Sequence, residues 1–251
     1  MPKKHVFIPD CQVKPGVSLD HLTWAGKYIA EKRPDVIVCG GDFADMPSLS
    51  SYDKPGSKQY EGRRYQKDVD AARRGMELLL EPIARARSYK PRLVLVLGNH
   101  EDRISRAVET DARLLGTIGL DDLRYQEAGW QVVPFRKPIK IDGTFYCHYF
   151  PSGVMGRPCT SARKVLTTFH VSCIAGHQQG RDVAYAKRGD GRFLTAIIAG
   201  SFYQHDEEYL GPLANVCWRG IVMLNEVRDG QFDEMFVSLG YLRRRHGSRS
   251  R

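Results

Sequence analysis

Five clusters of polar side chains in this sequence have the composition of a metal-binding site. Carboxylate, imidazole and amide groups coordinate divalent metal ions in proteins, and imidazole is also the side chain that most often moves protons in catalysis. In chain order, the clusters contain Asp10 and Gln12, Asp42 and Asp45, Asn99 and His100, His148, and His177 and Gln179. We therefore expect these side chains to come together around a metal centre.

Each cluster directly follows an apolar segment that is typical of a β-strand. The segments are HVFI at 5–8, VIVC at 36–39, LVLVL at 93–97, FYC at 145–147 and VSCIAG at 171–176. In open α/β sheets the ligand-binding loops converge beyond the carboxyl ends of the strands. A G-D-x-x-D stretch also suits a turn, and His148 alone could be a structural histidine. Asn99 and His100 side by side after a strand have little structural use, which favours the metal site.

The elements that must position these clusters change in character along the chain. The first hundred residues alternate apolar strands with helices, which predicts a mainly parallel sheet with right-handed crossovers. From about Trp130 onward the strands follow one another closely, with one helix near 161–169. An α/β half followed by a strand-rich half predicts an α/β fold, a two-sheet mixed β-sandwich flanked by helices.

Length and composition indicate one large domain at 1–242. The chain has 251 residues, of which 42% are hydrophobic and 27% are charged, as in ordinary globular proteins. No apolar run approaches the length of a membrane span, and the first residues do not resemble a signal peptide, so we expect a cytoplasmic protein without a membrane partner. The six cysteines form no C-x-x-C pair, which favours reduced thiols.

Basic residues outnumber acidic ones, and part of the excess is at the carboxyl terminus. The formal net charge is +9, and residues 243–251 include five arginines. We expect 243–251 to be a basic, disordered tail. Such a tail could hold a polyanion, although a solvated chain end explains the charge equally well.

The order of the motifs resembles the calcineurin-like metallophosphoesterases, whose pattern is D-x-H, G-D-x-x-D, G-N-H-[E/D], a lone H and G-H-x-H. The resemblance spans residues 10–179 and implies a four-layer fold with two divalent metal ions. It implies that Asp42 bridges the ions and that Asn99, His148 and His177 complete one ligand set. It also implies that His100 is the catalytic acid, oriented by Asp45.

The second ligand set departs from the family pattern. The resemblance implies Asp10, Asp42 and two histidines, but this chain has Gln12 and Gln179 at the histidine positions. Amide oxygens make the set harder, which favours Mn²⁺ or Mg²⁺, with Fe or Zn²⁺ as alternatives. Amide oxygen is also a weaker ligand than imidazole, so this ion would bind loosely. A mononuclear or inactive site is the alternative.

The resemblance implies hydrolysis of phosphate esters by a metal-bound hydroxide, with His100 protonating the leaving oxygen. We expect a phosphodiesterase or nuclease acting on nucleic acid, because the chain is basic and the family includes DNA-repair nucleases. The paired glutamines also resemble members encoded by bacteriophages, which would work in the host cytoplasm. Arg103 and Arg157 are candidates for gripping phosphate, and His205 is a further candidate for the site.

Two other functions remain open at this point. One is a phosphomonoesterase for nucleotides or small metabolites. The other is a catalytically weakened binding module of the same fold, which the two glutamines would favour. No feature of the sequence indicates an oligomeric state.

Overall fold

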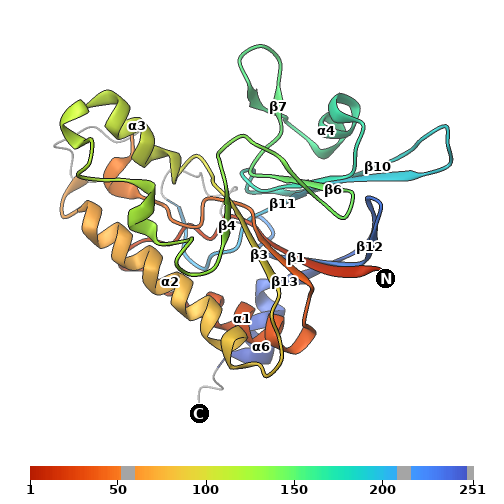
Figure 1. The fold of residues 1–251 in the computed structure, drawn as a ribbon, viewed down its shortest axis with the longest axis horizontal. Helices are drawn as coiled ribbons and strands as arrows, with labels where there is room; N and C mark the ends of the chain where they lie inside the picture. The colour runs from red at the N-terminus through yellow and green to blue at the C-terminus, as the bar shows by residue number, and fades with distance from the viewer. Residues whose placement is uncertain (52–59, 208–215, 248–251) are drawn as a thin grey trace.

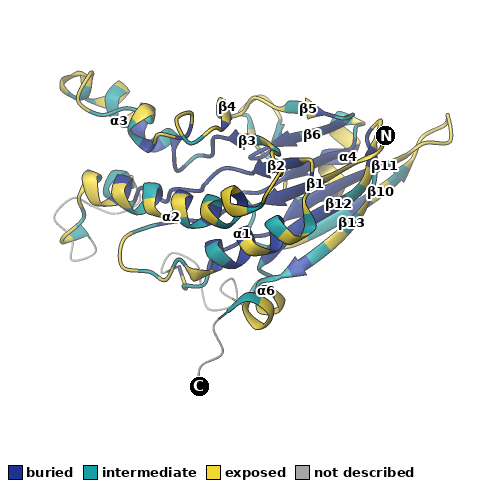
Figure 2. Ribbon diagram, turned by 60° about the horizontal axis from the view of Figure 1, so that its bottom comes forward, coloured by how far each residue is buried: buried dark blue, intermediate teal, exposed yellow. Residues whose placement is uncertain are grey.

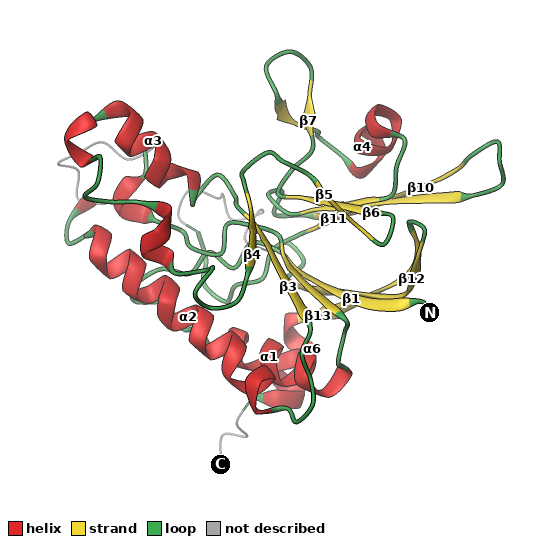
Figure 3. Ribbon diagram, in the orientation of Figure 1, coloured by secondary structure: helices red, strands yellow, loops and turns green. Residues whose placement is uncertain are grey.

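Two mixed β-sheets pack face to face in the structure, a computed structural model that describes residues 1–51, 60–207 and 216–247 (Figure 1). Helices cover the outer faces of both sheets, so the molecule has four layers (Figure 3). The predicted fold class, a two-sheet mixed β-sandwich flanked by helices, is confirmed.

The first sheet has the strand order β13-β12-β1-β2-β3-β4. Its strands are β1 (Lys3–Ile8), β2 (Val36–Cys39), β3 (Arg92–Val96), β4 (Gln131–Val133), β12 (Gly220–Arg228) and β13 (Gln231–Ser238). Strands β1 to β4 are parallel, and β12 and β13 extend the sheet with antiparallel pairs. The predicted crossovers are α1 (Asp20–Lys32) between β1 and β2, and α2 (Tyr65–Arg85) between β2 and β3.

The second sheet has the strand order β10-β11-β9-β6-β5. Its strands are β5 (Ile139–Ile141), β6 (Thr144–Cys147), β9 (Cys173–Ala175), β10 (Arg181–Lys187) and β11 (Phe193–Ala199). The three central strands are parallel and both edge strands are antiparallel. A small hairpin of β7 (Pro151–Ser152) and β8 (Arg157–Pro158) follows β6, and α4 (Ala162–Phe169) precedes β9.

The remaining elements of the described residues are helical. They are η1 (Pro47–Leu49), α3 (Asp102–Thr110), η3 (Ala112–Leu114), η4 (Leu120–Leu123) and α6 (Leu239–His246). Helix α3 begins directly after the G-N-H-E cluster, so the third loop of the site is bounded by β3 on one side and by α3 on the other.

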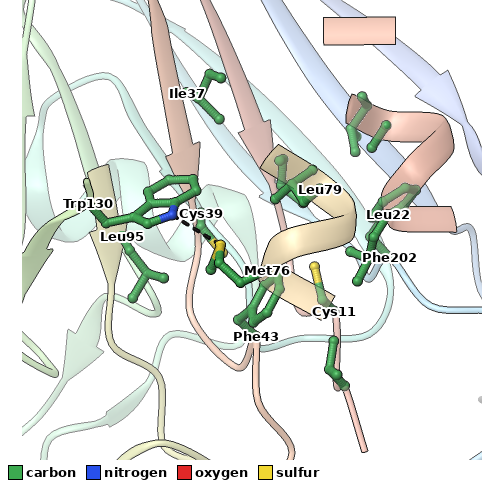
Figure 4. Close-up of a cluster of buried hydrophobic side chains, with 14 of the residues drawn as sticks. Cys11, Leu22, Ile37, Cys39, Phe43, Met76, Leu79, Leu95, Trp130 and Phe202 are labelled. Atoms are coloured by element: carbon green, nitrogen blue, oxygen red, sulfur yellow. Dashed lines mark hydrogen bonds between the residues drawn. The ribbon is translucent and has the colours of Figure 1, made fainter. Parts of the chain in front are cut away.

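Strand residues alternate between two hydrophobic cores, as the period of a β-strand requires. In β2, Val36 and Val38 pack between the sheets, whereas Ile37 and Cys39 pack under α1 and α2. Figure 4 shows the second of these cores, in which Trp130 donates a hydrogen bond to the sulfur of Met76 at 3.0 Å. The central strands β1, β2 and β3 are therefore buried on both faces toward their carboxyl ends (Figure 2).

The expectation of a disordered tail from residue 243 was wrong for its first residues. Helix α6 runs to His246, because Leu242 is buried in the core beneath α1 and Arg245 pairs with the carboxylate of Glu31 at 2.7 Å. Residues 248–251 lie outside the described part of the chain. All six cysteines are free thiols, as predicted. No helix among the described residues has the length and apolar character needed to cross a membrane.

Candidate metal centre

All five polar clusters lie at one end of the sandwich, on loops that follow β1, β2, β3, β6 and β9. These strands are parallel within each sheet, so their carboxyl ends meet there. Backbone hydrogen bonds tie the loops together. The N–H of Gln12 donates to the carbonyl of Asp42 at 2.8 Å, and the N–H of Gly176 donates to the carbonyl of His148 at 2.9 Å.

Four potential ligand atoms converge, from Asp42, Asn99, His148 and His177. Asn99 Oδ1 lies 2.9 Å from His148 Nε2 and 2.9 Å from His177 Nδ1. The two imidazole nitrogens are 3.2 Å apart, and Asp42 Oδ2 lies 3.4 Å from His148 Nε2. One ligand atom each from Asp42, His148 and His177 lies within 4.8 Å of the other two, close enough to hold one metal ion together.

The tautomer of His148 is set by a hydrogen bond on the far side of its ring. Nδ1 lies 2.8 Å from the carbonyl oxygen of Gly40, so it must donate a proton there. In the neutral ring Nε2 is then unprotonated and directs its lone pair at Asn99 and Asp42. A second hydrogen bond of this kind is how proteins orient histidines that bind metals.

The ligand atoms of Asp42, Asn99, His148 and His177 are stable this close together only with a positive charge among them. Burial alone lowers the pKa of His148, but the adjacent carboxylate of Asp42 raises this pKa to about 10. Burial and the neighbouring His148 lower the pKa of His177 to about 4. Four acceptor atoms this close repel one another unless a proton or a cation lies between them. The donor set, two imidazoles with two oxygens, therefore fits a divalent metal ion.

Asp42 is held by its own loop and by the next one. Its φ angle is 48°, and its Oδ1 accepts a hydrogen bond from the backbone N–H of His100 at 2.9 Å. A side chain at Gly98 would place its Cβ 2.1 Å from Asp42 Oδ1, which explains the glycine of the G-N-H-E motif. Burial raises the pKa of Asp42, but the charges of His100 and His148 outweigh burial and hold this pKa well below its usual range.

His100 and Asp45 form the pair that the resemblance implied. Nδ1 of His100 lies 2.7 Å from Asp45 Oδ1, which leaves Nε2 facing Asp42 Oδ2 at 3.7 Å. Burial lowers the pKa of His100, but the charge of Asp42 and the hydrogen bond to Asp45 outweigh it, so the pKa is raised. The imidazole can therefore hold a proton next to the ligand cluster.

The two arginines expected to grip phosphate differ in position. Arg103 is buried, and its Nη1 donates to the carbonyl oxygens of Asp45 at 2.8 Å and Met46 at 3.3 Å. Its Nη2 lies 3.3 Å from His100 Nε2, so its guanidinium borders the site while holding the Asp45 loop. Arg157 is exposed on β8, and no contact of its side chain with the cluster is found among the described residues.

In the second expected ligand set, Asp10 and Gln179 lie side by side and each is engaged in hydrogen bonds. Asp10 Oδ1 accepts the backbone N–H of His177 at 2.8 Å. Asp10 Oδ2 lies 3.4 Å from the amide nitrogen of Gln179, whose oxygen accepts the hydroxyl of Tyr203 at 2.7 Å. Gln12, two residues after Asp10, is buried and has a φ angle of 42°. Burial, together with the charge of Asp42, raises the pKa of Asp10 to about 7, although His148 opposes this.

Two charged groups near the site, the buried Glu101 and the half-buried Lys14, were not singled out from the sequence. Glu101 accepts the backbone N–H groups of Asp42, Ala44 and Gly98, each at 2.9 Å, and so joins the second and third loops. Its position directly after His100 in the G-N-H-E motif was the sequence feature that could have pointed to it. Lys14 pairs with Glu207 at 2.7 Å and lies 3.6 Å from Asp45 Oδ2. Glu207 also bonds His205 at 2.6 Å, so His205 borders the site through this pair.

No protein-family model matches the sequence, and a search of curated proteins finds no similar sequence. Among solved structures, the chain is similar to YfcE, a phosphoesterase from E. coli, with 13% identity over 94% of this chain and 99% of that chain and a TM-score of 0.40. A second solved structure matches with 12% identity over 95% of this chain and 100% of that chain, at a TM-score of 0.39.

Proposed function

We propose that this protein is a metal-dependent phosphoesterase that hydrolyses phosphodiester bonds in nucleic acid. The observation that carries the proposal is the position of Asp42 Oδ2, 3.4 Å from His148 Nε2 in the ligand cluster and 3.7 Å from Nε2 of His100. A group of metal ligands and a proton donor thus adjoin one carboxylate. This is the combination that cleavage of a phosphate ester by water requires.

Asp42, Asn99, His148 and His177 would hold the ion. A divalent ion there would polarise a phosphoryl oxygen and lower the pKa of water, and two imidazoles with two oxygens suit a transition-metal ion such as Zn²⁺, Fe²⁺ or Mn²⁺. The contact between His148 and the carbonyl of Gly40 keeps Nε2 directed at the ion, and Glu101 keeps the loops of Asp42 and Asn99 in register.

His100 would supply the proton for the leaving oxygen. Asp45 accepts the Nδ1 proton, so the proton to be transferred would be carried on Nε2, which lies 3.7 Å from Asp42 Oδ2 and 3.3 Å from Arg103 Nη2. Arg103 holds Asp45 through its backbone carbonyl, and Lys14 lies near the other carboxylate oxygen. General acid catalysis of this kind contributes about 10²–10⁴-fold to a rate.

The choice of a nucleic-acid substrate is supported by charge. The chain has a formal net charge of +9, and two arginines lie next to residues at the cluster. Arg106 donates to the carbonyl of Asn99 at 3.1 Å. Arg136 donates to the hydroxyl of Tyr149 at 2.7 Å, and the Tyr149 ring packs against His177. Cations at these positions favour a polyanion over a neutral substrate.

The test is hydrolysis by the purified protein in Mn²⁺ of four substrates: bis-p-nitrophenyl phosphate, p-nitrophenyl phosphate, and single- and double-stranded DNA. We expect turnover of the diester and of DNA, and no turnover by His148→Ala. Hydrolysis of the monoester alone would replace the proposal with a phosphomonoesterase. Metal binding without any hydrolysis would replace it with a binding module.

A further inference from the structure

The two ligand sets of the site differ in how their polar atoms are satisfied. In the set of Asp42, Asn99, His148 and His177, acceptor atoms face one another at 2.9–3.4 Å. Around Asp10 and Gln179, donors face acceptors: Asp10 accepts from the backbone N–H of His177 and lies near the amide nitrogen of Gln179, whose oxygen accepts from Tyr203. The first set needs a proton or a cation between its atoms, whereas the carboxylate of Asp10 in the second set already has hydrogen-bond donors at both of its oxygens.

The orientation of the Gln179 amide decides this difference. Its nitrogen faces Asp10 Oδ2 at 3.4 Å and its oxygen accepts the Tyr203 hydroxyl at 2.7 Å. The reverse orientation would bring an amide oxygen to the same distance from a carboxylate oxygen. That arrangement is unfavourable without a cation between them, so the hydrogen bonds themselves select the observed orientation.

Asp10 is further engaged from the other side of its carboxylate. Its Oδ1 accepts the backbone N–H of His177, and a Cβ at Gly176 would lie 2.3 Å from the same oxygen. The carboxylate is therefore fixed between the His177 loop and Gln179, and Tyr203 is buried where it holds the far end of the amide. To bind an ion strongly here, the chain would have to break the contact between Gln179 and Asp10.

We propose that the protein binds one divalent cation tightly, at Asp42, Asn99, His148 and His177, and that the chain from Tyr203 through Gln179 to Asp10 takes the place of a second ion. The inference rests on the proposed function only in its use of the first set as the metal site. Tyr203 is a positioning residue in this arrangement, because it acts on the site through Gln179.

The test is the metal content of the full chain, measured by calorimetric titration with Mn²⁺ and by elemental analysis after gel filtration. We expect one tight Mn²⁺ per wild-type chain and none in His148→Ala. The double variant with Gln12→His and Gln179→His should bind two ions, since imidazole replaces both amides. Gln178→His is the matched control, because the side chain of Gln178 bonds the carbonyl of Cys159, and it should bind one ion.

Electron paramagnetic resonance provides a readout that does not depend on activity, and its wild-type spectrum requires no variant. Wild-type protein loaded with Mn²⁺ should give the six-line spectrum of an isolated ion, and the double histidine variant should give the spectrum of a coupled pair. A coupled pair, or two ions of similar affinity, in the wild type would overturn the inference. A folded double variant that still binds one ion would overturn the role given to the glutamines.

The two proposals fail in different ways. If the wild type binds two ions and His148→Ala loses one of them, only the single-ion inference fails. If His148→Ala keeps its full metal content, the first set is not the metal site, and the proposed function fails with it.

Discussion

Glu101 and Asp42 are joined at the centre of the site, where Oε2 of Glu101 accepts the backbone N–H of Asp42 at 2.9 Å. The same carboxylate accepts the N–H groups of Ala44 and Gly98, so one side chain satisfies three donors from two loops. Glu101 is fully buried. The position of Asp42, the central candidate ligand, therefore depends on Glu101, whose carboxylate need not contact the ion itself.

Glu101→Ala should lower the free energy of unfolding substantially. The substitution leaves three backbone donors without their acceptor, and each buried donor left unsatisfied costs about 1–3 kcal/mol, so a loss of about 3 kcal/mol or more is expected. Urea unfolding measures the effect. Glu109→Ala, at an exposed position on α3, is the control and should change the stability little. Equal losses in the two variants would contradict the role of Glu101.

His100→Ala should keep the metal and lose most of the activity. His100 lies beside the ligand cluster without being part of it, so removing the proton donor should lower kcat about 10²–10⁴-fold. Asp42→Ala should lose both activity and metal. Elemental analysis of the two purified variants separates these outcomes. Equal loss of metal in both variants would show that His100 is a ligand and would refute its assignment as the acid.

Arg103→Met should lower kcat more than it changes KM. The buried guanidinium donates to the carbonyl oxygens of Asp45 and Met46. Its loss should loosen this loop, and with it the Asp45 carboxylate that orients His100. A drop in kcat of about tenfold corresponds to about 1.4 kcal/mol of transition-state stabilisation. Arg157→Met, on the exposed β8, is the control. A rise in KM with unchanged kcat would instead support the sequence-based expectation that Arg103 grips phosphate.

Stability should fall below neutral pH in a way that depends on His21. This side chain is fully buried against Phe202, and neither ring nitrogen has a hydrogen-bond partner among the described residues. Burial, together with the charge of His205, lowers the pKa of His21 from 6.5 to about 3. A folded-state pKa below the unfolded value means that the stabilisation is complete above pH 6.5. It is then lost progressively as the pH falls toward 3.

Between pH 7 and pH 5 this loss amounts to about 2 kcal/mol. His21→Leu should therefore flatten the pH dependence of urea unfolding in this range. His170→Asn is the control, because His170 is exposed at the end of α4 with a left-handed φ of 53° that asparagine tolerates. If His21→Leu and the wild type lose stability in parallel on acidification, His21 is not the cause.

Mn²⁺ should raise the Tm of the protein, and a chelator should lower it again. The ion would relieve the crowding of acceptor atoms around Asn99 and His148. Binding to the folded state alone contributes about 2.7 kcal/mol at a free concentration of 100 times Kd. Differential scanning fluorimetry measures the shift, with His148→Ala as the control that should not respond. A wild-type Tm that is insensitive to Mn²⁺ over the millimolar range would count against the metal site.

Much of the fold and of the site's location could be predicted from local features of the sequence. Apolar strands separated by helices predicted the parallel part of the first sheet, because strands buried on both faces must be apolar throughout and parallel strands need crossovers. Polar clusters directly after the strands could be predicted to meet, because parallel strands end at the same edge. Helix α6 near the carboxyl terminus could not be predicted from the sequence. It is held by contacts with α1, which is distant in the chain.

The sequence by itself determined which side chains are at the site: five loops with Asp, Asn, His and Gln at the ends of five strands. Only the tertiary structure decided what those side chains do. Gly40 sets the tautomer of His148, Arg103 turns toward Asp45, and Tyr203 turns the amide of Gln179 toward Asp10. The reason is that tautomers, amide orientations and the directions of long side chains depend on partners distant in the chain, whose positions are known only once the sheets have packed.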